Sequence, residues 1–123
     1  MKTKGLFIFL FVMILMGIQP MPAQTAYQGF NKLHYEQLLR TRSCPGCMLY
    51  YARLSGIDLS GANLRGASLI GATMRNATLR NVNFYGARIK GIDFSGADLS
   101  GATWSDGRVC GEGSIGYCKT GQN

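Results

Sequence analysis

Four cysteines are the side chains with the clearest chemical potential in this sequence. They form two groups, Cys44-Pro-Gly-Cys47 and, further along, Cys110 with Cys118. A Cys-x-x-Cys pair suits thiol–disulfide exchange when it opens a helix. Four cysteines have the ligand types of a structural zinc site. An even number of cysteines in an exported chain favours disulfides instead. The segments around the cysteines must decide among these three kinds of chemistry.

Other catalytic side chains are isolated. His34 is the only histidine, and no cluster of carboxylates accompanies it. The repeated serines have no base beside them, and three aspartates are spread along the chain rather than paired: Ser55, Ser60, Ser68, Ser95, Ser100, Ser105, Asp58, Asp93 and Asp98. No nucleophile, base or complete metal shell can be assembled at a plausible spacing. The sequence therefore predicts no enzyme, no small-molecule substrate, no cofactor and no metal site.

The segment that must position these residues repeats every five residues from Ala52 to Asp106, in eleven copies that share one frame. A helix would show a period of 3.6 and a half-buried strand a period of 2. In each copy, the first residue is small or aliphatic and the third is apolar. The fifth is usually Gly, which turns a chain without steric cost. Each copy thus predicts a short extended segment and a corner, and a regular repeat predicts a solenoid.

These copies resemble the consensus of the pentapeptide-repeat family, Ala-(Asp/Asn)-Leu-x-x. Residues 62–66 and 97–101 match it letter for letter. The resemblance implies a right-handed, four-sided β-helix with four copies per coil, so we expect an all-β solenoid of about three coils. Cys44-Pro-Gly-Cys47 occupies the place of a family entry segment, from which Met48, Tyr50 and Tyr51 depart. Degenerate copies at 47–51 and 107–111 extend the predicted β-helix to residues 47–111.

The two ends have different compositions. Residues 1–26 begin with Lys2 and Lys4, continue through an uncharged apolar stretch and reach small residues, which is typical of a secretory signal peptide. The stretch is short for an uncleaved membrane anchor, the alternative interpretation. We therefore expect an exported protein, either periplasmic or extracellular. Residues 27–46 contain an amphipathic pattern with Asn31 as N-cap, which predicts a helix that covers the first coil. Residues 112–123 form a C-terminal cap or tail.

This organisation favours a structural role for the cysteines. The Cys44-Pro-Gly-Cys47 segment follows a predicted helix without a βαβ pattern, so redox chemistry has little support. A zinc site of all four cysteines would need the C-terminal tail to fold back along the stack of coils. Three disulfide pairings are possible. We favour Cys44 with Cys47 and Cys110 with Cys118, because a rigid stack of coils separates the two groups.

Charge suggests a binding surface. Without Lys2 and Lys4 the chain has a net charge of about +5. The stretch from Leu59 to Ile92 contains no acidic residue and five basic ones in predicted outward positions: Arg65, Arg75, Arg80, Arg88 and Lys90. Such a basic belt suits anionic lipid, an acidic cell-envelope polymer or nucleic acid. A solvated surface is the alternative. The frame also places Arg65 one coil from Tyr85, where a cation–π contact would be structural.

Together these observations predict a non-catalytic, exported scaffold that acts as a protein-interaction or structural module. The alternative is polyanion binding through the basic belt. The family resemblance also raises a third function, because some members mimic DNA and modulate topoisomerases. A DNA mimic should be acidic, long and cytoplasmic, whereas this chain is basic, short and begins like an exported protein. Its partner is then an unknown protein or an acidic envelope polymer rather than nucleic acid, and its oligomeric state is left open.

Overall fold

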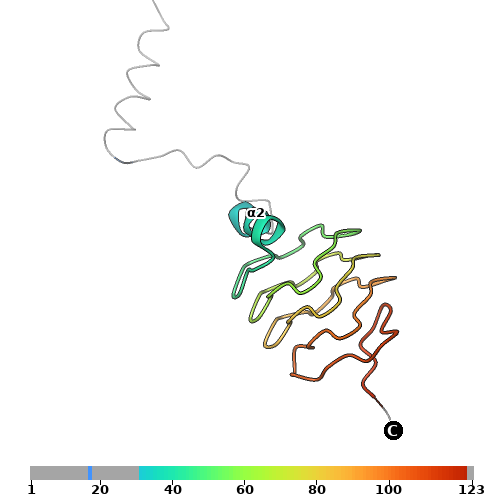
Figure 1. Ribbon diagram of the computed structural model, residues 1–123. Helices are drawn as coiled ribbons and strands as arrows, with labels where there is room; N and C mark the ends of the chain where they lie inside the picture. The colour runs from blue at the N-terminus through green and yellow to red at the C-terminus, as the bar shows by residue number, and fades with distance from the viewer. Residues whose placement is uncertain (1–16, 18–30, 122–123) are drawn as a thin grey trace, which may run out of the picture.

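A four-sided coil forms the main body of the computed structural model, which describes Gly17 and residues 31–121 (Figure 1). Parallel backbone bridges join residues one turn apart, beginning with Ser43 and Asn63 and ending with Asn83 and Thr103. Each turn therefore takes four five-residue copies, one for each face. In the described residues these bridges are isolated and do not join into longer strands, because the chain bends after every short face. The predicted quadrilateral β-helix is confirmed.

The second residue of each copy identifies its face. Residues of one face lie above one another in successive turns: Ser43, Asn63, Asn83 and Thr103 on face A; Met48, Ser68 and Arg88 on face B; Arg53, Thr73 and Asp93 on face C; Asp58, Thr78 and Asp98 on face D. Outward residues at the fourth position form parallel columns beside these. Neighbours on the surface are consequently far apart in the sequence.

The first and third residues of the copies form the core. Leu54, Leu64 and Leu79 are among the large side chains with no exposed surface. Burying a side chain of this size contributes roughly 1.5–3 kcal/mol. Near the C-terminal end the core becomes aromatic, and the rings of Phe94 and Trp104 lie 5.4 Å apart between centroids. Trp104 packs against Phe94 in the last turn and stays partly exposed.

The fifth residue of each copy except the last, which ends in Asp106, makes the corner in the left-handed conformation. Gly96 has φ 70°, and Asn76, one turn before it in the same column, has φ 56°. The amide oxygen of Asn76 lies where a Cβ on Gly96 would be. Gly96 therefore has two reasons to be glycine, its backbone conformation and the side chain of the adjacent turn.

The helix α2 (Lys32–Thr41) lies across the first turn of the coil (Figure 1). The side chain of Asn31 caps it by accepting from the amides of Leu33 and His34. The apolar pattern predicted more burial than the structure shows. Only Leu38 is fully buried in the helix, whereas Leu33 is 73% exposed. Tyr35 is partly buried against the same core, so Leu38 and Tyr35 make the apolar contact of the helix.

Polar groups of α2 bind the free backbone edge of the first turn. On face B, the amide of Asn31 donates to the carbonyl of Met48, and His34 Nδ1 accepts from the Met48 amide at 3.0 Å. Gln37 donates to the carbonyl of Ser43 on face A. Tyr35 donates its hydroxyl to the carbonyl of Arg53 on face C. The helix thus supplies partners that another turn would supply, which protects an open edge.

The parallel ladder begins and ends at other residues than the β-helix predicted for residues 47–111. It begins at Ser43, so Cys44 already occupies an inward position in the first turn. At the other end, residues 107–111 do not continue it. Val109 pairs antiparallel with Thr103, and Ile115 pairs antiparallel with Asp98. The chain reverses after Trp104, where the Arg108 guanidinium binds the Asp106 carboxylate at 2.7 Å.

The predicted signal peptide at residues 1–26 lies outside the described residues, apart from Gly17. In Gly17 and residues 31–121, no helix has the length and apolar character needed to span a bilayer.

Candidate binding face

The cysteines form two disulfides, Cys44–Cys47 and Cys110–Cys118, as predicted. Cys44 Sγ lies 3.2 Å from the carbonyl oxygen of His34, so the first disulfide packs beneath α2. The second disulfide ties the reversed tail to the residues that pair with the last turn. The first disulfide therefore links two positions of the first turn, and the second closes a loop within the tail. Within residues 31–121, His, Cys, Asp and Glu do not gather in groups of three or more that could hold a metal ion.

The acidic residues of the repeats take part in local turns. The carboxylate of Asp58 accepts from the amide and hydroxyl of Ser60, and Asp93 binds Ser95 in the same way. These bonds, above all those from the two serine hydroxyls, lower the pKa of both aspartates from its ordinary value. His34 likewise has a structural partner in the Met48 amide. These residues stabilise the backbone around them.

Three residues of the predicted basic belt are held by neighbours in the coil or the tail. The Arg65 guanidinium lies 4.8 Å from the centre of the Tyr85 ring, as the frame predicted. Arg75 lies 3.6 Å from the carboxylate of Asp93, which belongs to the next turn. Arg80 contacts two carboxylates, as described next. The acidic partners lie beyond Ile92 in the sequence, which is why the stretch looked purely basic.

Among the five residues of the basic belt, Arg80 has the shortest ion pairs. Its guanidinium lies 3.1 Å from the carboxylate of Asp98 and 3.0 Å from that of Glu112. The hydrogen bond to Asp98 is the main reason that the pKa of Arg80 is raised further. Arg80 thus joins face D to the tail, and little of its charge is left for an external anion.

Arg88 and Lys90 differ from the other three. Both are exposed, both lie on face B, and neither pairs with an acidic residue among those described. The outward column two residues along from Arg88 contains Tyr50, Ile70 and Lys90 in successive turns. Face B contains no acidic side chain from residue 47 to 51, from 67 to 71 or from 87 to 91. Face B therefore has the unpaired Arg88 and Lys90 in its last turn and an aromatic and aliphatic surface in its earlier turns.

Tyr51 is the most unusual residue of face B. It occupies a corner with φ 56°, although a bulky side chain disfavours this conformation. It is nevertheless 65% exposed, and its ring lies against Gly71, where a Cβ would collide with it. Met48, on the same turn, is 47% exposed. Backbone strain combined with an exposed aromatic ring is typical of binding sites.

In the sequence, Met48, Tyr50 and Tyr51 stand out only as departures from the family entry segment, far from Arg88 and Lys90. The available signal was the spacing of twenty residues, which puts Met48 above Ser68 and Arg88 in one column. Counting outward positions by turn would have found this face.

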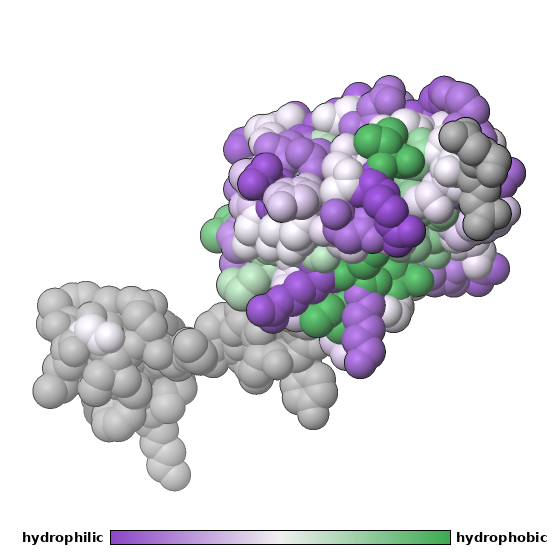
Figure 2. Space-filling model, turned by 90° about the horizontal axis from the view of Figure 1, so that it is seen from below, coloured by the Kyte–Doolittle hydropathy of each residue, from purple (hydrophilic) through white to green (hydrophobic). Residues whose placement is uncertain are grey.

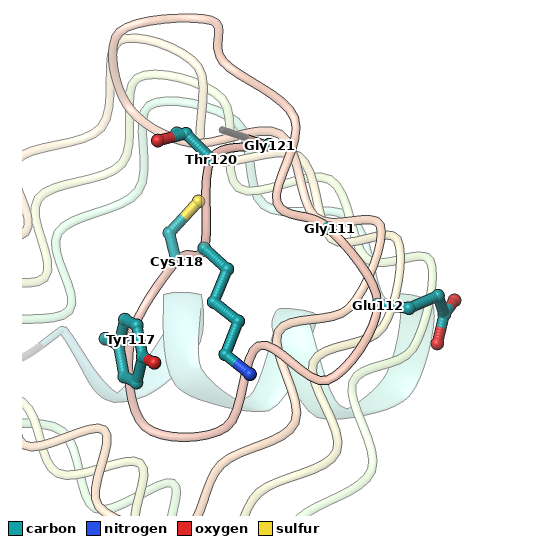
Figure 3. Close-up of a pocket in the computed structure, with 7 residues that line it drawn as sticks. Gly111, Glu112, Tyr117, Cys118, Thr120 and Gly121 are labelled. Atoms are coloured by element: carbon teal, nitrogen blue, oxygen red, sulfur yellow. The ribbon is translucent and has the colours of Figure 1, made fainter. Parts of the chain in front are cut away.

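A hollow lies beside the C-terminal disulfide (Figure 3). Gly111, Glu112, Tyr117, Cys118, Lys119, Thr120 and Gly121 line it. Glu112 points away from Tyr117 in this view and is bound by Arg80. The Lys119 ammonium lies 5.9 Å from the Tyr117 ring. This hollow offers one cation and one aromatic ring, a smaller set of contact groups than face B.

Comparison with known families agrees with this geometry. The profile for pentapeptide repeats matches eight copies, at residues 44–66 and 62–101. The chain is a pentapeptide-repeat protein. No curated protein matches the sequence. Pentapeptide repeats form the right-handed quadrilateral β-helix described above.

Two solved pentapeptide-repeat proteins resemble this chain. One comes from the thylakoid lumen of Arabidopsis thaliana, with 24% identity and a TM-score of 0.53 over 75% of this chain and 59% of the other. The second is HetL, involved in heterocyst differentiation regulation in the cyanobacterium Nostoc. It has 32% identity and a TM-score of 0.43 over 55% of this chain and 36% of HetL. The chain therefore spans about three-fifths of the first structure's length, and that likeness shows a common fold.

Face B has one large residue in its corner column. The corner column holds Tyr51, Gly71 and Gly91, so only the first turn departs from glycine. Asn, which takes the same conformation at Asn76 and Asn81, would satisfy the corner with less strain. The fold thus gives no reason for tyrosine at this corner.

Proposed function

We propose that this pentapeptide-repeat protein is an exported, non-catalytic scaffold that binds a partner protein through face B. The observation that carries the proposal is Tyr51, an exposed aromatic ring held at a strained corner above Gly71. Tyrosine, methionine and arginine are enriched at protein interfaces, and tyrosine and arginine often dominate binding energy. Face B presents Met48, Tyr51 and Arg88 on one rigid surface.

Rigidity supports this role. Backbone hydrogen bonds join Leu49 to Ser68 and Leu69 to Arg88 at 2.8 Å each, so the successive turns of face B have fixed positions. A surface that does not rearrange loses little conformational entropy on binding. The scaffold can therefore bind with few contacts.

Export is supported by the two disulfides, since disulfides persist in oxidising compartments. We propose that residues 1–26 act as a cleaved signal peptide and that the protein functions beyond the cytoplasmic membrane. Fusion of these residues to a reporter enzyme that is active only after export tests this. Reporter activity that is lost when Leu10 is changed to Arg supports export, and activity confined to the cytoplasm contradicts it.

Pull-down from a cell-envelope extract tests the partner-binding function. Tyr51→Asn should keep the fold, because Asn already forms this corner at Asn76 and Asn81. It should reduce recovery of a specific partner at least tenfold. Tyr85→Ser is the matched control, since Tyr85 is also exposed but lies on face A. Equal recovery with wild type and Tyr51→Asn contradicts binding through face B.

Arg88 and Lys90 favour a second candidate function, binding of an acidic envelope polymer. Their charges have no acidic partner within residues 31–121, unlike those of Arg75 and Arg80. Heparin provides a defined polyanionic probe. Arg88→Gln with Lys90→Gln should weaken retention on heparin and lower its salt dependence, because fewer counterions are released. The matched pair Arg75→Gln with Arg80→Gln should have a smaller effect. Retention that is independent of salt contradicts this function.

A further inference from the structure

Face B ends in a free backbone edge at the last turn. In interior turns, the amides of the third and fifth residues donate to the next turn, as Leu69 and Gly71 do to Arg88 and Lys90. The carbonyl of the first residue accepts from that turn. Three such groups of the last turn on face B have no hydrogen-bond partner within residues 31–121: the amides of Ile89 and Gly91 and the carbonyl of Ala87. An edge of this kind is a template for another strand.

The tail covers the same edge on other faces. The amide of Leu99 on face D donates to Ser114, and that of Trp104 on face A donates to Arg108. Because the chain reverses after Trp104, it runs back along faces A and D before it reaches face B. The edge of face B therefore stays open in the part of the chain that the structure describes.

Apolar surface accompanies the free edge. Leu49 and Leu69 have no exposed surface, whereas Ile89, next in their column, is only partly buried. Figure 2, seen from the side on which the C-terminal turn lies, shows apolar areas within the hydrophilic surface. A strand that adds to face B can thus bury an inward apolar side chain against Ile89.

The coil itself shows which outward side chain fits beside such an edge. On faces C and D, the arginine at the fourth position pairs with the aspartate at the second position of the next turn. Arg75 lies 3.6 Å from Asp93, and Arg80 lies 3.1 Å from Asp98. Lys90 holds the same fourth position on face B, where the described chain has no next turn and thus no aspartate. A strand that continues face B should bring a carboxylate to the equivalent place.

We propose that the partner protein supplies this missing strand, as an extended segment with the pattern acidic, apolar, acidic. The segment runs parallel to residues 88–90, as successive turns of the coil do. The backbone of its first acidic residue donates to the carbonyl of Ala87 and accepts from the amide of Ile89. The carbonyl of its second acidic residue accepts from the amide of Gly91. All three free groups of the edge are then paired.

Side chains give this contact its specificity. The first acidic side chain lies beside Arg88 and diagonally from Lys90, both of which are exposed and unpaired within residues 31–121. The apolar side chain points inward and packs on Ile89. In strand addition, the backbone supplies affinity and alternate side chains supply selectivity. The inference rests on the protein-binding role proposed for face B, and it names the chemistry of the partner.

A synthetic peptide is the first test. The probe is Ala-Asp-Val-Glu-Gly, blocked at both ends and added to isotope-labelled full-length protein up to millimolar concentration. The nuclear magnetic resonance signals of the Ile89 and Gly91 amides should shift and saturate, whereas that of Leu69, already bonded inside the coil, should stay. Ala-Asn-Val-Gln-Gly should bind at least tenfold more weakly, because its hydrogen bonds to the two cations lose their charge. Unchanged signals at Ile89 and Gly91 overturn the proposal.

Methylation of the peptide backbone separates strand pairing from attraction by charge alone. An N-methyl group on the aspartate removes the donor to Ala87 and should weaken binding at least tenfold. The same group on the valine is the matched control, because the valine amide faces away from the edge in a parallel strand. Equal binding of both methylated peptides overturns strand addition. Weaker binding of the valine-methylated peptide alone overturns the parallel register.

Protein variants test the side-chain contacts. Arg88→Gln with Lys90→Gln should weaken binding of the acidic peptide at least tenfold, since both cations face its first carboxylate. Arg53→Gln is the control, as Arg53 is an exposed arginine of the first turn on face C. Equal losses in the two proteins contradict recognition at the end of face B.

Comparison with the pull-down distinguishes this inference from the proposed function. A partner that is lost from Tyr51→Asn, combined with no peptide binding by the wild-type protein, overturns the added strand and leaves partner binding through face B standing. Peptide binding at Ile89 and Gly91, combined with full partner recovery by Tyr51→Asn, supports the strand and contradicts the role of Tyr51.

Discussion

Aspartate and asparagine at the second position of the repeat shape the corner that follows them. The side-chain oxygens of Asn63 and Asn83 accept from the amides two residues ahead, at 3.1 and 2.9 Å. Asp58 binds the Ser60 amide in the same way and adds the serine hydroxyl. Such local bonds mimic a backbone turn. The consensus preference for these residue types is thus a consequence of backbone geometry.

Acid should weaken the fold through these aspartates. The serine hydroxyls and amides hold the pKa of Asp58 and Asp93 below the ordinary value of about 3.9. Their stabilising effect is complete above that value and is lost as pH falls through the lowered pKa. The double variant Asp58→Asn with Asp93→Asn should keep the turns, as Asn63 does. Its stability should fall less than that of the wild type below about pH 4. Urea unfolding at pH 7 and pH 3 measures this difference.

Glu36→Gln provides the control for these measurements. Glu36 lies on α2, where it pairs with Lys32 at the exposed helix surface. An equal change of stability with pH in the double variant and the wild type would contradict a role for the two turn aspartates.

At the scale of elements, the two ends of the coil are closed by different means. α2 binds the first turn with side chains, and the tail binds the last turn with its backbone. The N-terminal helix was predictable because Asn31 and the apolar spacing mark it. The tail was not predictable from the repeat, because its antiparallel pairing depends on a reversal after Trp104 and on carbonyls of residues outside the frame, such as Ser114.

His34 should prove structural. His34→Phe removes the acceptor for the Met48 amide while keeping a ring of similar size. We expect a loss on the order of 1 kcal/mol, because one hydrogen bond of the coil edge is lost. For a domain of this size, that loss lowers Tm by roughly 4–8 °C. Lys32→Ala, at the exposed side of the same helix, should change Tm much less. An unchanged Tm in His34→Phe would exclude this capping role.

The second disulfide should control closure of faces D and A. Cys110→Ser with Cys118→Ser should speed hydrogen exchange at the amides of Leu99, Gly101 and Trp104, which the tail binds. Amides in the interior turns should keep their protection, because coil stacking does not depend on the tail. Disulfides of native domains typically contribute about 2–4 kcal/mol, and less for short loops such as this one. Unchanged exchange at the three amides would show that the tail is held without the disulfide.

At the scale of the whole molecule, the fold was predictable and the candidate binding face was only partly so. The five-residue period determines which side chains are buried, since inward and outward positions alternate within every copy. It also predicted the Arg65–Tyr85 contact. Face B required knowledge of the turn length, which places Met48 and Arg88 on one surface. Ion pairs such as Arg80 with Glu112 required the path of the tail, which no repeat pattern contains.

A five-residue insertion should separate folding from binding. Repeating Ala-Asn-Leu-Arg-Gly after Gly66 keeps every inward residue inward, so circular dichroism and cooperative unfolding should be retained. All later outward residues move by one face, however, and Arg88 no longer lies below Met48. Partner or heparin binding that needs both ends of face B should fall at least tenfold. Binding at wild-type strength by the folded insertion variant would contradict a shared surface.

The turn of twenty residues also limits how related chains can change length. An insertion of one repeat leaves the core pattern unchanged and rotates the surface beyond it by a quarter turn. An insertion of four repeats restores every face. Selection for stability alone would therefore accept length changes of five residues. Selection for a surface that spans several turns would accept only changes of twenty residues. Length differences among homologues thus record whether a face has been kept for binding.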